Sequence, residues 1–421
     1  MLRDLFSIPD QWMGLPVFGF GWLLILWALG SIALLVWLWR RHGWSSETIG
    51  YLPVLLIFGA VIAFVLPMLE KNTPEGGLPI RGYGVMLLLA VVAGVALAAR
   101  QAYRMGLSPD VIYSLAFWVF VGGIVGARTF YVIQYWDQFQ RDNLASTIGA
   151  ILNVTEGGLV VYGSLLGGLV AGASFVITNK LPALAIADLV APSLMLGLAI
   201  GRIGCLLNGC CYGGPCDIPW LGLSFPSTSP VYERQHSLGE LYGFHLGVDP
   251  QTHGPRVETV HPGTAADAAG LKPGTAILAI DGYTTKTFEN AALALAQADA
   301  TVVIDTGQEP VTIRMSSLPS HALPVHPTQI YSSMNAGLLC LLLWAYYPFR
   351  RRDGEVFAAL FLLYPFTRIL LEVIRTDEAG KFGTGLTISQ LVSLVLMVLA
   401  AGLWLFILRR PRGSALPIVN A

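Results

Sequence analysis

The sequence is poor in charged residues, which make up only 12% of its 421 residues, while hydrophobic residues make up 54%. A soluble globular domain carries about 25% charged residues, so most of this chain belongs in lipid. The formal net charge is −1, which argues against a nucleic-acid partner. The chain lacks the paired-histidine motif of metalloproteases and the Gly-x-Ser-Gly motif of rhomboid proteases, so an intramembrane protease is not expected.

Apolar runs of about 18 or more residues predict about nine membrane spans. They cover residues 17–39, 51–69, 83–102, 112–134, 157–178, 184–207, 328–348, 355–374 and 387–408. The run 328–348 is the most polar of them, because Asn335 and several serines dilute it. No secretory cleavage site is evident, and Arg40 and Arg41 follow the first run, so we expect a retained helix there.

Basic residues predict how these spans are oriented, because cytoplasmic loops are rich in lysine and arginine. One set of alternate loops carries Arg40, Arg41, Arg100, Arg104, Lys180, Arg350, Arg351, Arg352, Arg409, Arg410 and Arg412. The opposite loops carry fewer basic residues, so the richer set is expected in the cytoplasm. The N-terminus is then outside, the C-terminus is cytoplasmic, and the long connection 208–325 is extracytoplasmic.

Residues 236–318 change in character, because apolar runs shorten to strand length and turn residues appear. We expect helices at 265–270 and 288–298, and strands near 257–260, 276–280, 302–304 and 311–313. This order resembles a bacterial PDZ domain. The resemblance implies a carboxylate-binding loop at His245, Leu246, Gly247 and Val248, beside which a peptide ligand would add as a strand. A domain that merely braces the membrane part is the alternative.

Two arginines lie within or at the end of apolar runs. Arg202 stands at the outer end of run 184–207, and an arginine beside hydrocarbon costs about 2.5–3.5 kcal/mol on insertion scales. Arg368 lies inside a second run, with Glu372 on the same helical face at i+4. Two cations near the outer surface are a natural receptor for a lipid phosphate. An internal ion pair that stabilises the helix bundle is the plainer alternative.

Other polar motifs are expected on the same outer side. They are residues 81–84 with Tyr83, 126–131 with Arg128, 156–163 with Glu156 and Tyr162, and 326–331 with His326. Each has a plain structural interpretation as well: Tyr83 as an interfacial residue, Arg128 as a side chain that snorkels to headgroups, and the glycines as helix-packing positions.

Together these motifs resemble those of the prolipoprotein diacylglyceryl transferase family of bacterial membrane enzymes. The resemblance covers about residues 80–410, interrupted by the PDZ-like insert, and depends most on residues 201–209 and 326–331 and on Arg368 with Glu372. It implies transfer of a diacylglyceryl group from phosphatidylglycerol to the lipobox cysteine thiol of prolipoproteins, at the outer face of the bacterial inner membrane. No metal or other cofactor is implied. The expected partners are phosphatidylglycerol and prolipoprotein signal peptides, and a monomer is expected.

The resemblance also implies roles for single residues. Arg202 and Arg368 would hold the phosphate, and Glu372 would orient Arg368. The candidate catalytic residues are Arg202, Arg368, Glu372, Tyr162 and His326. The candidate substrate-binding residues are Tyr83, Arg128, Asn208, Gly163, Gly201 and Tyr364.

The chain departs from the family pattern at three positions. The family usually has histidine at Tyr162, asparagine at Cys205 and glutamate at Cys210. Tyrosine is a poor base at neutral pH unless nearby arginines shift its pKa, and His326 and Glu372 are the alternative bases. A non-catalytic phospholipid- or lipoprotein-binding membrane protein that has lost the base is therefore an alternative. An anion transporter is less expected, because both arginines lie near the outer edge and not at the midplane.

Four of the five cysteines lie close together in the sequence: Cys205, Cys210, Cys211 and Cys216. An oxidising outer compartment favours a disulfide among them, and four cysteines allow three pairings. A zinc site and free thiols are the alternatives, although the spacing matches no standard zinc pattern. The sequence therefore predicts four segments: an N-terminal extension with two spans (1–79), two parts of a transferase-like membrane domain (80–235 and 319–421), and the extracytoplasmic PDZ-like domain (236–318) between spans six and seven.

Overall fold

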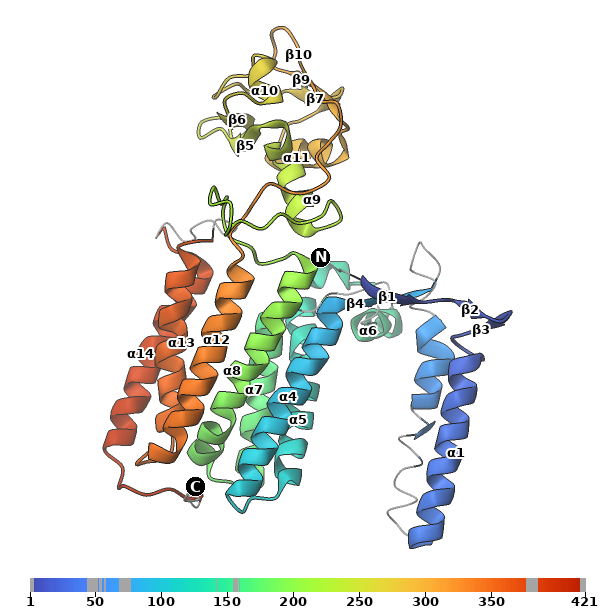
Figure 1. Ribbon diagram of the computed structural model, residues 1–421, viewed down its shortest axis with the longest axis vertical. Coiled ribbons are helices and arrows are strands. Elements are labelled where there is room, and N and C mark those ends of the chain that lie inside the picture. The colour runs from blue at the N-terminus through green and yellow to red at the C-terminus, as the bar shows by residue number, and fades with distance from the viewer. Residues whose placement is uncertain are drawn as a thin grey trace. The chain divides into compact units, whose positions relative to one another are not determined.

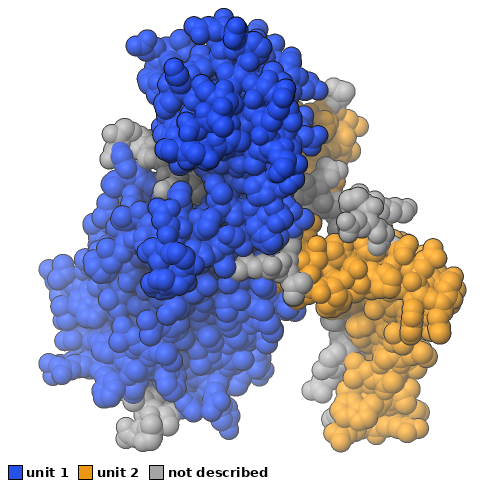
Figure 2. Space-filling model, turned by 45° about the horizontal axis from the view of Figure 1, so that its top comes forward, with its two compact units in different colours: residues 1–3, 85–116, 175–421 blue, residues 4–84, 117–174 orange. Residues whose placement is uncertain are grey.

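The computed structural model describes residues 4–43, 52, 55, 56, 58–67, 77–141, 143–153, 158, 160–375 and 385–416. The chain divides into two compact units (Figure 2). Unit 1 contains residues 85–116 and 175–421, and unit 2 contains residues 4–84 and 117–174. Each unit is described by itself.

Long helices build most of unit 1. They are α4 (Gly82–Arg104), the first part of α5 (Pro109–Gln134), α8 (Ala183–Asn208), α12 (Thr328–Tyr346), α13 (Glu355–Glu372) and α14 (Ile388–Leu408). Helix α8 packs against α12 and α13, and α13 packs against α14 (Figure 1). Fully or nearly fully buried side chains such as Leu189, Leu343 and Val356 form the shared apolar core. This packing fixes α8 and α13 side by side, which matters because each carries one of the two arginines.

A buried ionic cluster joins α8 to the beginning of α13. Asp188 has no exposed surface, and its carboxylate accepts backbone N–H bonds from Gly354 at 2.7 Å and Phe357 at 2.8 Å. Arg350 lies 3.6 Å from the same carboxylate and stacks 3.8 Å from the centre of the Tyr347 ring. The carboxylate satisfies amide groups that a helix N-terminus leaves without intrahelical partners. The cluster therefore fixes how α8 and α13 pack at the end away from Arg202.

Within the described part of the chain, six helices are long and apolar enough to cross a membrane. They are Trp22–Arg41, Gly82–Arg104, Pro109–Gln134, Val161–Thr178, Ala183–Asn208 and Ile388–Leu408. The chain is thus a polytopic helical membrane protein, and the count of nine spans stays a prediction. The segments 328–348 and 355–374 also form helices, α12 and α13, but Asn335 dilutes the first and three charged residues interrupt the second. Run 51–69 is described in part, and its residues 58–67 are helical, with a π-helical stretch at Val61–Val65.

A small α+β domain, called the insert below, lies between α9 (Pro230–Ser237) and α12 in unit 1 (Figure 1). Its elements are η3 (Glu240–Tyr242), β5 (Phe244–Val248), β6 (Pro255–Val260), α10 (Ala265–Ala268), β7 (Ala279–Ile280), β8 (Tyr283–Thr284), α11 (Phe288–Gln297), β9 (Thr301–Asp305) and β10 (Val311–Arg314). Strands β5 and β6 pair with each other, and the second sheet has the order β10-β9-β7-β8. The predicted helices are present, and β7 pairs antiparallel with β8, and β9 with β10. Strand β7 is shorter than the predicted run 276–280.

Residues 245–248 are not the loop that the sequence predicted. They form most of β5, which pairs antiparallel with β6. The chain turns before this strand, because Gly239 and Gly243 both adopt positive φ angles of 79° and 94°. The backbone N–H groups of Phe244 and Leu246 donate to the carbonyl oxygens of Gly239 and Leu238 at 3.3 and 2.8 Å. The carboxylate-loop assignment of His245, Leu246, Gly247 and Val248 is therefore corrected, since this edge of the strand is already hydrogen-bonded where a peptide would begin to add.

Unit 2 contains the N-terminal segment and a second group of helices. Its elements are β1 (Asp4–Ile8), β2 (Gln11–Trp12), β3 (Leu15–Pro16), α1 (Trp22–His42), the π-helix η1 (Val61–Val65), β4 (Leu78–Arg81), the second part of α5, η2 (Trp136–Gln138), α6 (Leu144–Leu152) and α7 (Val161–Thr178). Strand β1 pairs antiparallel with β4, and β2 pairs with β3. Helices α5 and α7 approach closely through glycines, because a Cβ at Gly163 would lie 2.5 Å from the carbonyl oxygen of Gly126.

Candidate active site

The outer end of α8 is shaped by a glycine. Gly209 has a left-handed φ of 72°, which ends the helix at Asn208. The N–H groups of Gly209 and Cys210 donate to the carbonyl oxygens of Leu206 and Cys205 at 3.2 and 3.1 Å. The chain therefore turns sharply and places Cys210 and Cys211 beside the last turn of the helix that carries Arg202.

Arg202 is a half-buried cation with no hydrogen bond or ion pair to any of the described residues. A Cβ added at the neighbouring Gly201 would meet nothing within 4 Å, so the space beside this turn of α8 is open. An unpaired guanidinium at the end of an apolar helix is costly unless a ligand or water receives its donors. The side chain is thus positioned to bind an anion.

Arg368 on α13 is held from two sides. Its Nη2 lies 2.8 Å from Glu372 Oε2, and its Nε donates to Ser389 Oγ at 3.1 Å. Its Nη1 is buried and has no hydrogen-bond partner among the residues that the structure describes. Glu372 is fixed in turn, because Thr387 donates to its Oε1 at 3.2 Å and Arg375 lies 3.9 Å away. Glu372 therefore orients Arg368 and leaves one guanidinium nitrogen available to a ligand.

Arg202 on α8 and Arg368 on α13 lie on helices that pack against each other. Arg202, Tyr364 and Arg375 all lie within electrostatic range of Arg368. Arg202 and Arg375 also lie within range of Cys211. Helices α8 and α13 thus surround the beginning of the loop after Asn208 with positive charge.

The beginning of α12 holds this loop in place. Thr328 Oγ1 donates to the carbonyl oxygen of Cys211 at 2.7 Å, and Gln329 Nε2 donates to that of Cys210 at 2.7 Å. The two side chains are 1% and 0% exposed. Both residues belong to the motif 326–331, in which only His326 was predicted to have a role. His326 Nδ1 lies 3.4 Å from the Tyr331 hydroxyl. Within the described part of the chain, His326 makes no hydrogen bond or ion pair with Arg202 or Arg368, and its backbone instead pairs with that of Gly213 and Gly214.

The cysteines gather at the same place. The sulfur atoms of Cys205, Cys210 and Cys211 all lie within 4.8 Å of one another, and all three residues are partly exposed. Hydrogen bonds from the other two thiols lower the pKa of the Cys211 thiol, and the nearby guanidinium groups of Arg202 and Arg375 lower it further. Cys216 is buried apart from them, with its sulfur 3.8 Å from the Ile218 carbonyl oxygen. All five cysteines are free thiols in the structure, whereas the sequence predicted a disulfide among four of them.

The sequence profile described as prolipoprotein diacylglyceryl transferase matches residues 73–407. A relative from Rhodopirellula baltica, named phosphatidylglycerol–prolipoprotein diacylglyceryl transferase, is 37% identical over 435 residues, which is 96% of this chain and 88% of that protein. Relatives with the same name from Gloeobacter violaceus and Synechococcus elongatus are 28% and 39% identical. The first match spans 81% of this chain and 93% of that protein, and the second spans 34% and 48%. The chain belongs to the prolipoprotein diacylglyceryl transferase family.

Arg128 has a structural role in this transferase family member. Its guanidinium donates to the carbonyl oxygens of Ile151 at 2.8 Å, Ala150 at 2.9 Å, Asn153 at 2.7 Å and Gly158 at 3.2 Å. These bonds satisfy carbonyl groups at and beyond the C-terminal end of α6, which has no further helical turn to receive them. The assignment of Arg128 as a substrate-binding residue is therefore corrected, because its donors are already engaged.

Tyr83, Tyr162 and Gly163 belong to unit 2, whereas the arginine pair belongs to unit 1. Tyr162 lies in the first turn of α7 and is 50% exposed, and Tyr83 lies at the beginning of α4 and is 41% exposed. Gly163 lies where α7 packs closely against α5, and its role in substrate binding stays a prediction. Glu156 lies outside the described residues.

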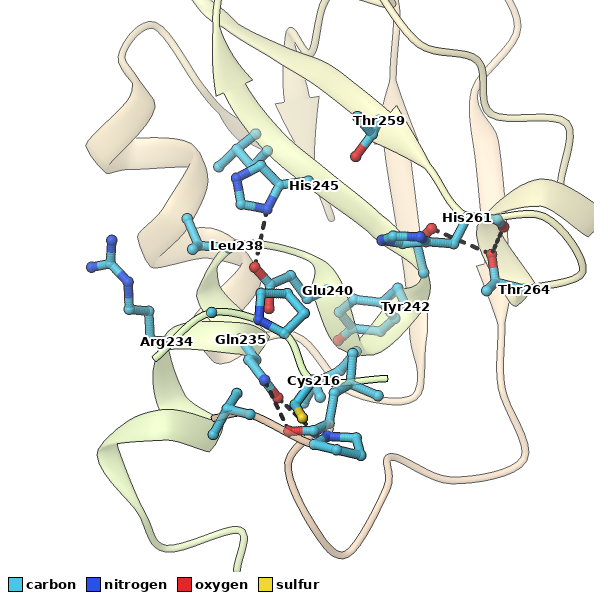
Figure 3. Close-up of a pocket in the computed structure, with 18 of the residues that line it drawn as sticks. Cys216, Arg234, Gln235, Leu238, Glu240, Tyr242, His245, Thr259, His261 and Thr264 are labelled. Atoms are coloured by element: carbon cyan, nitrogen blue, oxygen red, sulfur yellow. Dashed lines mark hydrogen bonds and ion pairs between the residues drawn. The ribbon is translucent and has the colours of Figure 1, made fainter. Parts of the chain in front are cut away.

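A cavity of about 1320 Å³ lies between the insert and the loop after α8 (Figure 3). Its walls carry charges of both signs, with Arg234, Glu240 and His245 among the labelled side chains. His245 Nδ1 lies 3.0 Å from Glu240 Oε1, and this hydrogen bond raises the pKa of the imidazole. The transferase-like segment 212–224 forms one wall, so a molecule in the cavity touches both the insert and the membrane domain.

Proposed function

We propose that this chain transfers a diacylglyceryl group from phosphatidylglycerol to the lipobox cysteine thiol of prolipoproteins. The observation that carries the proposal is the arginine pair. None of the N–H donors of the Arg202 side chain is hydrogen-bonded to a described residue. Nη1 of Arg368 also has no partner among those residues, while the ion pair with Glu372 holds the other side of its guanidinium. Family membership supports the same reaction.

The chemistry fits this arrangement. The thiolate of the prolipoprotein cysteine attacks an sp³ carbon of the glyceryl group, the carbon–oxygen bond to phosphate breaks, and glycerol phosphate leaves with the bond's electrons. Negative charge therefore develops on phosphate oxygens. A planar guanidinium can donate two hydrogen bonds to such oxygens at once, and its effect is stronger in a partly desolvated site than in water.

The transfer also needs a base that accepts the proton of the substrate thiol. Glu372 is unsuited to the task, because its side chain is fully buried and held by Arg368 and Thr387. Within the proposal Glu372 is a positioning residue, and Tyr162 and His326 stay candidates for the base. Asn208, Tyr364 and Tyr83 stay candidates for contacts with the headgroup.

An assay with purified protein, phosphatidylglycerol and a lipobox peptide tests the proposal. We expect a thioether-linked product and release of glycerol phosphate in equal amounts. Binding of both substrates with no product would instead favour the non-catalytic lipid- or lipoprotein-binding alternative, which the tyrosine at position 162 keeps open.

We propose further that residues 236–318 form a PDZ-like extracytoplasmic domain whose peptide ligand occupies the cavity of Figure 3. The order of strands and helices supports the fold, and the cavity's mixed charges suit a peptide. The edge of β5 that does not pair with β6 is a poorer site for the end of the peptide, because the backbone N–H groups of Phe244 and Leu246 already donate to the preceding turn.

The proposed location is the bacterial inner membrane, with the N-terminus and the insert outside and the C-terminus in the cytoplasm. A monomer with four segments, 1–79, 80–235, 236–318 and 319–421, completes the proposal. The outer ends of α8, α13 and α14 lie at the same end of unit 1 as the insert, as this orientation requires (Figure 1).

A further inference from the structure

We propose that Cys205, Cys210 and Cys211 bind one zinc ion, and that the fourth coordination position of this ion receives the thiolate of the prolipoprotein cysteine. The first part stands on the cysteine cluster alone. The second part rests on the proposed function.

The sulfur geometry is close to that of a zinc site. Zinc–thiolate bonds of about 2.3 Å in a tetrahedral arrangement place sulfur atoms about 3.8 Å apart. The three sulfur atoms here already lie within 4.8 Å of one another. Small side-chain rotations close this difference, because all three residues are partly exposed. Thiolate ligands select soft or borderline metals such as zinc.

The backbone holds the cysteines in this arrangement without the metal. Gly209 ends α8 in the left-handed region, and Cys211 itself adopts a φ of 59°, which L-residues rarely do. The buried side chains of Thr328 and Gln329 hold the carbonyl oxygens of Cys211 and Cys210. A strained turn held by two buried hydrogen bonds is typical of a site whose geometry serves a ligand.

The surrounding charge suits such a centre. Three thiolates and Zn²⁺ carry a net charge of −1, and a fourth thiolate brings it to −2. Arg202 and Arg375 lie within electrostatic range of Cys211 and offset this charge. A site with three protein ligands and an open position is the arrangement that zinc adopts when it acts on a substrate.

The site would supply the nucleophile of the transfer. On binding zinc, the substrate thiol loses its proton to water or a nearby base, and a sulfur lone pair then forms the bond to the glyceryl carbon. The carbon–oxygen bond breaks, and its electrons leave on glycerol phosphate. Zinc keeps its oxidation state throughout. A metal-bound thiol is ionised at neutral pH, so this route removes the need for a strong base at Tyr162.

Metal content of the full-length protein tests the site independently of activity. The protein is purified in detergent with a tag that lacks histidine, reduced and incubated with Zn²⁺ or Co²⁺ alone. We expect one zinc per chain and a thiolate-to-cobalt absorption band. Single substitutions Cys205→Ser, Cys210→Ser and Cys211→Ser should each weaken binding at least tenfold, while Cys216→Ser and Cys340→Ser leave it unchanged.

Three results would overturn the zinc site: no bound zinc, zinc that persists in the triple serine variant, or a native disulfide between two of the three cysteines in a non-reduced peptide map. Helix content by circular dichroism shows that each variant is folded. The second part is tested by activity. Zinc removal should lower transfer at least tenfold and re-addition should restore it, whereas Arg202→Ala should lose transfer and keep its zinc. Full transfer by the triple serine variant would overturn the thiolate role alone. Metal binding without transfer by the native protein would overturn the proposed function, and with it the thiolate role, but not the zinc site.

Discussion

Replacement of Arg202 separates catalysis from stability. Arg202 has no partner among the described residues, so Arg202→Ala leaves no buried charge behind. A surface-type substitution of this kind changes the free energy of unfolding by about 0.5 kcal/mol or less. Loss of one donor to a developing oxyanion costs about 10²–10³ in rate, or about 2.7–4 kcal/mol. We therefore expect a large loss of transfer and little change in thermal stability.

Arg368 is the contrasting case. Arg368→Ala removes the 2.8 Å ion pair to Glu372, whose side chain has no exposed surface. Among the described cations, Arg375 then remains beside this carboxylate at 3.9 Å. Breaking a buried ion pair on one side costs about 3–5 kcal/mol. This variant should lose both transfer and stability, and Arg368→Ala with Glu372→Gln should regain part of the stability but not the activity.

The assay is release of glycerol phosphate from phosphatidylglycerol with a lipobox peptide, measured beside thermal unfolding in the same detergent. Arg202→Lys keeps the charge but loses the planar fork, so it should recover only part of the rate. Arg104→Ala is the matched control, because Arg104 is exposed in the last turn of α4 and should be neutral in both measurements. Transfer by Arg202→Ala within about threefold of the native rate, or a loss of stability as large as that of Arg368→Ala, would refute the reasoning.

Three further predictions concern the rest of the chain. Asp188→Ala should lower the free energy of unfolding by about 3–5 kcal/mol in chemical denaturation, because Arg350 and two helix N–H groups lose their buried acceptor; an unchanged midpoint would contradict the cluster's role. The hydrogen bond to Glu240 raises the pKa of His245, so its contribution should be complete below about pH 6.5 and lost as pH rises through the raised value. At pH 5.5, His245→Gln should be less stable to thermal unfolding than the native protein, by less than about 1 kcal/mol, and at pH 8.5 the two proteins should be equally stable. A stability difference that grows with pH would contradict this prediction. Replacement of residues 239–320 by a short linker should preserve transfer to short peptides and alter the choice among full-length prolipoproteins. The flanking segments should stay together, because Gln235 and Leu323 are joined by hydrogen bonds of 2.7 and 3.2 Å. Loss of transfer to short peptides too would assign the insert a bracing role.

Much of the helical framework could be predicted because its signals are local. Continuous apolar runs predicted α4, α8 and α14, and the i,i+4 spacing predicted the contact of Arg368 with Glu372. In the insert, Asp281 and Gly282 both have positive φ angles, as is typical of an Asp-Gly pair in a two-residue hairpin loop. Short apolar runs and turn residues likewise predicted β9 and β10.

The missed features depend on residues far apart in the sequence. Thr328 and Gln329 hold carbonyl groups more than a hundred residues away, which no local pattern reveals. Arg128 was expected to contact lipid headgroups, but its guanidinium instead donates hydrogen bonds to carbonyl oxygens at the C-terminal end of α6. Two left-handed glycines before Phe244 moved the strand onto residues expected to form a loop. The cysteine cluster depends on the left-handed conformation of Cys211, which residue type does not predict.

A double-substitution cycle for phospholipid binding tests most directly whether Arg202 and Arg368 hold one headgroup. The affinity of the full-length protein for phosphatidylglycerol is measured for the native protein, each alanine variant and the pair. If both guanidinium groups bind the same phosphate, the two losses should be coupled by about 0.5–3 kcal/mol. Losses that add within about 0.3–0.5 kcal/mol would show that the two arginines act at separate sites and would contradict the proposed function.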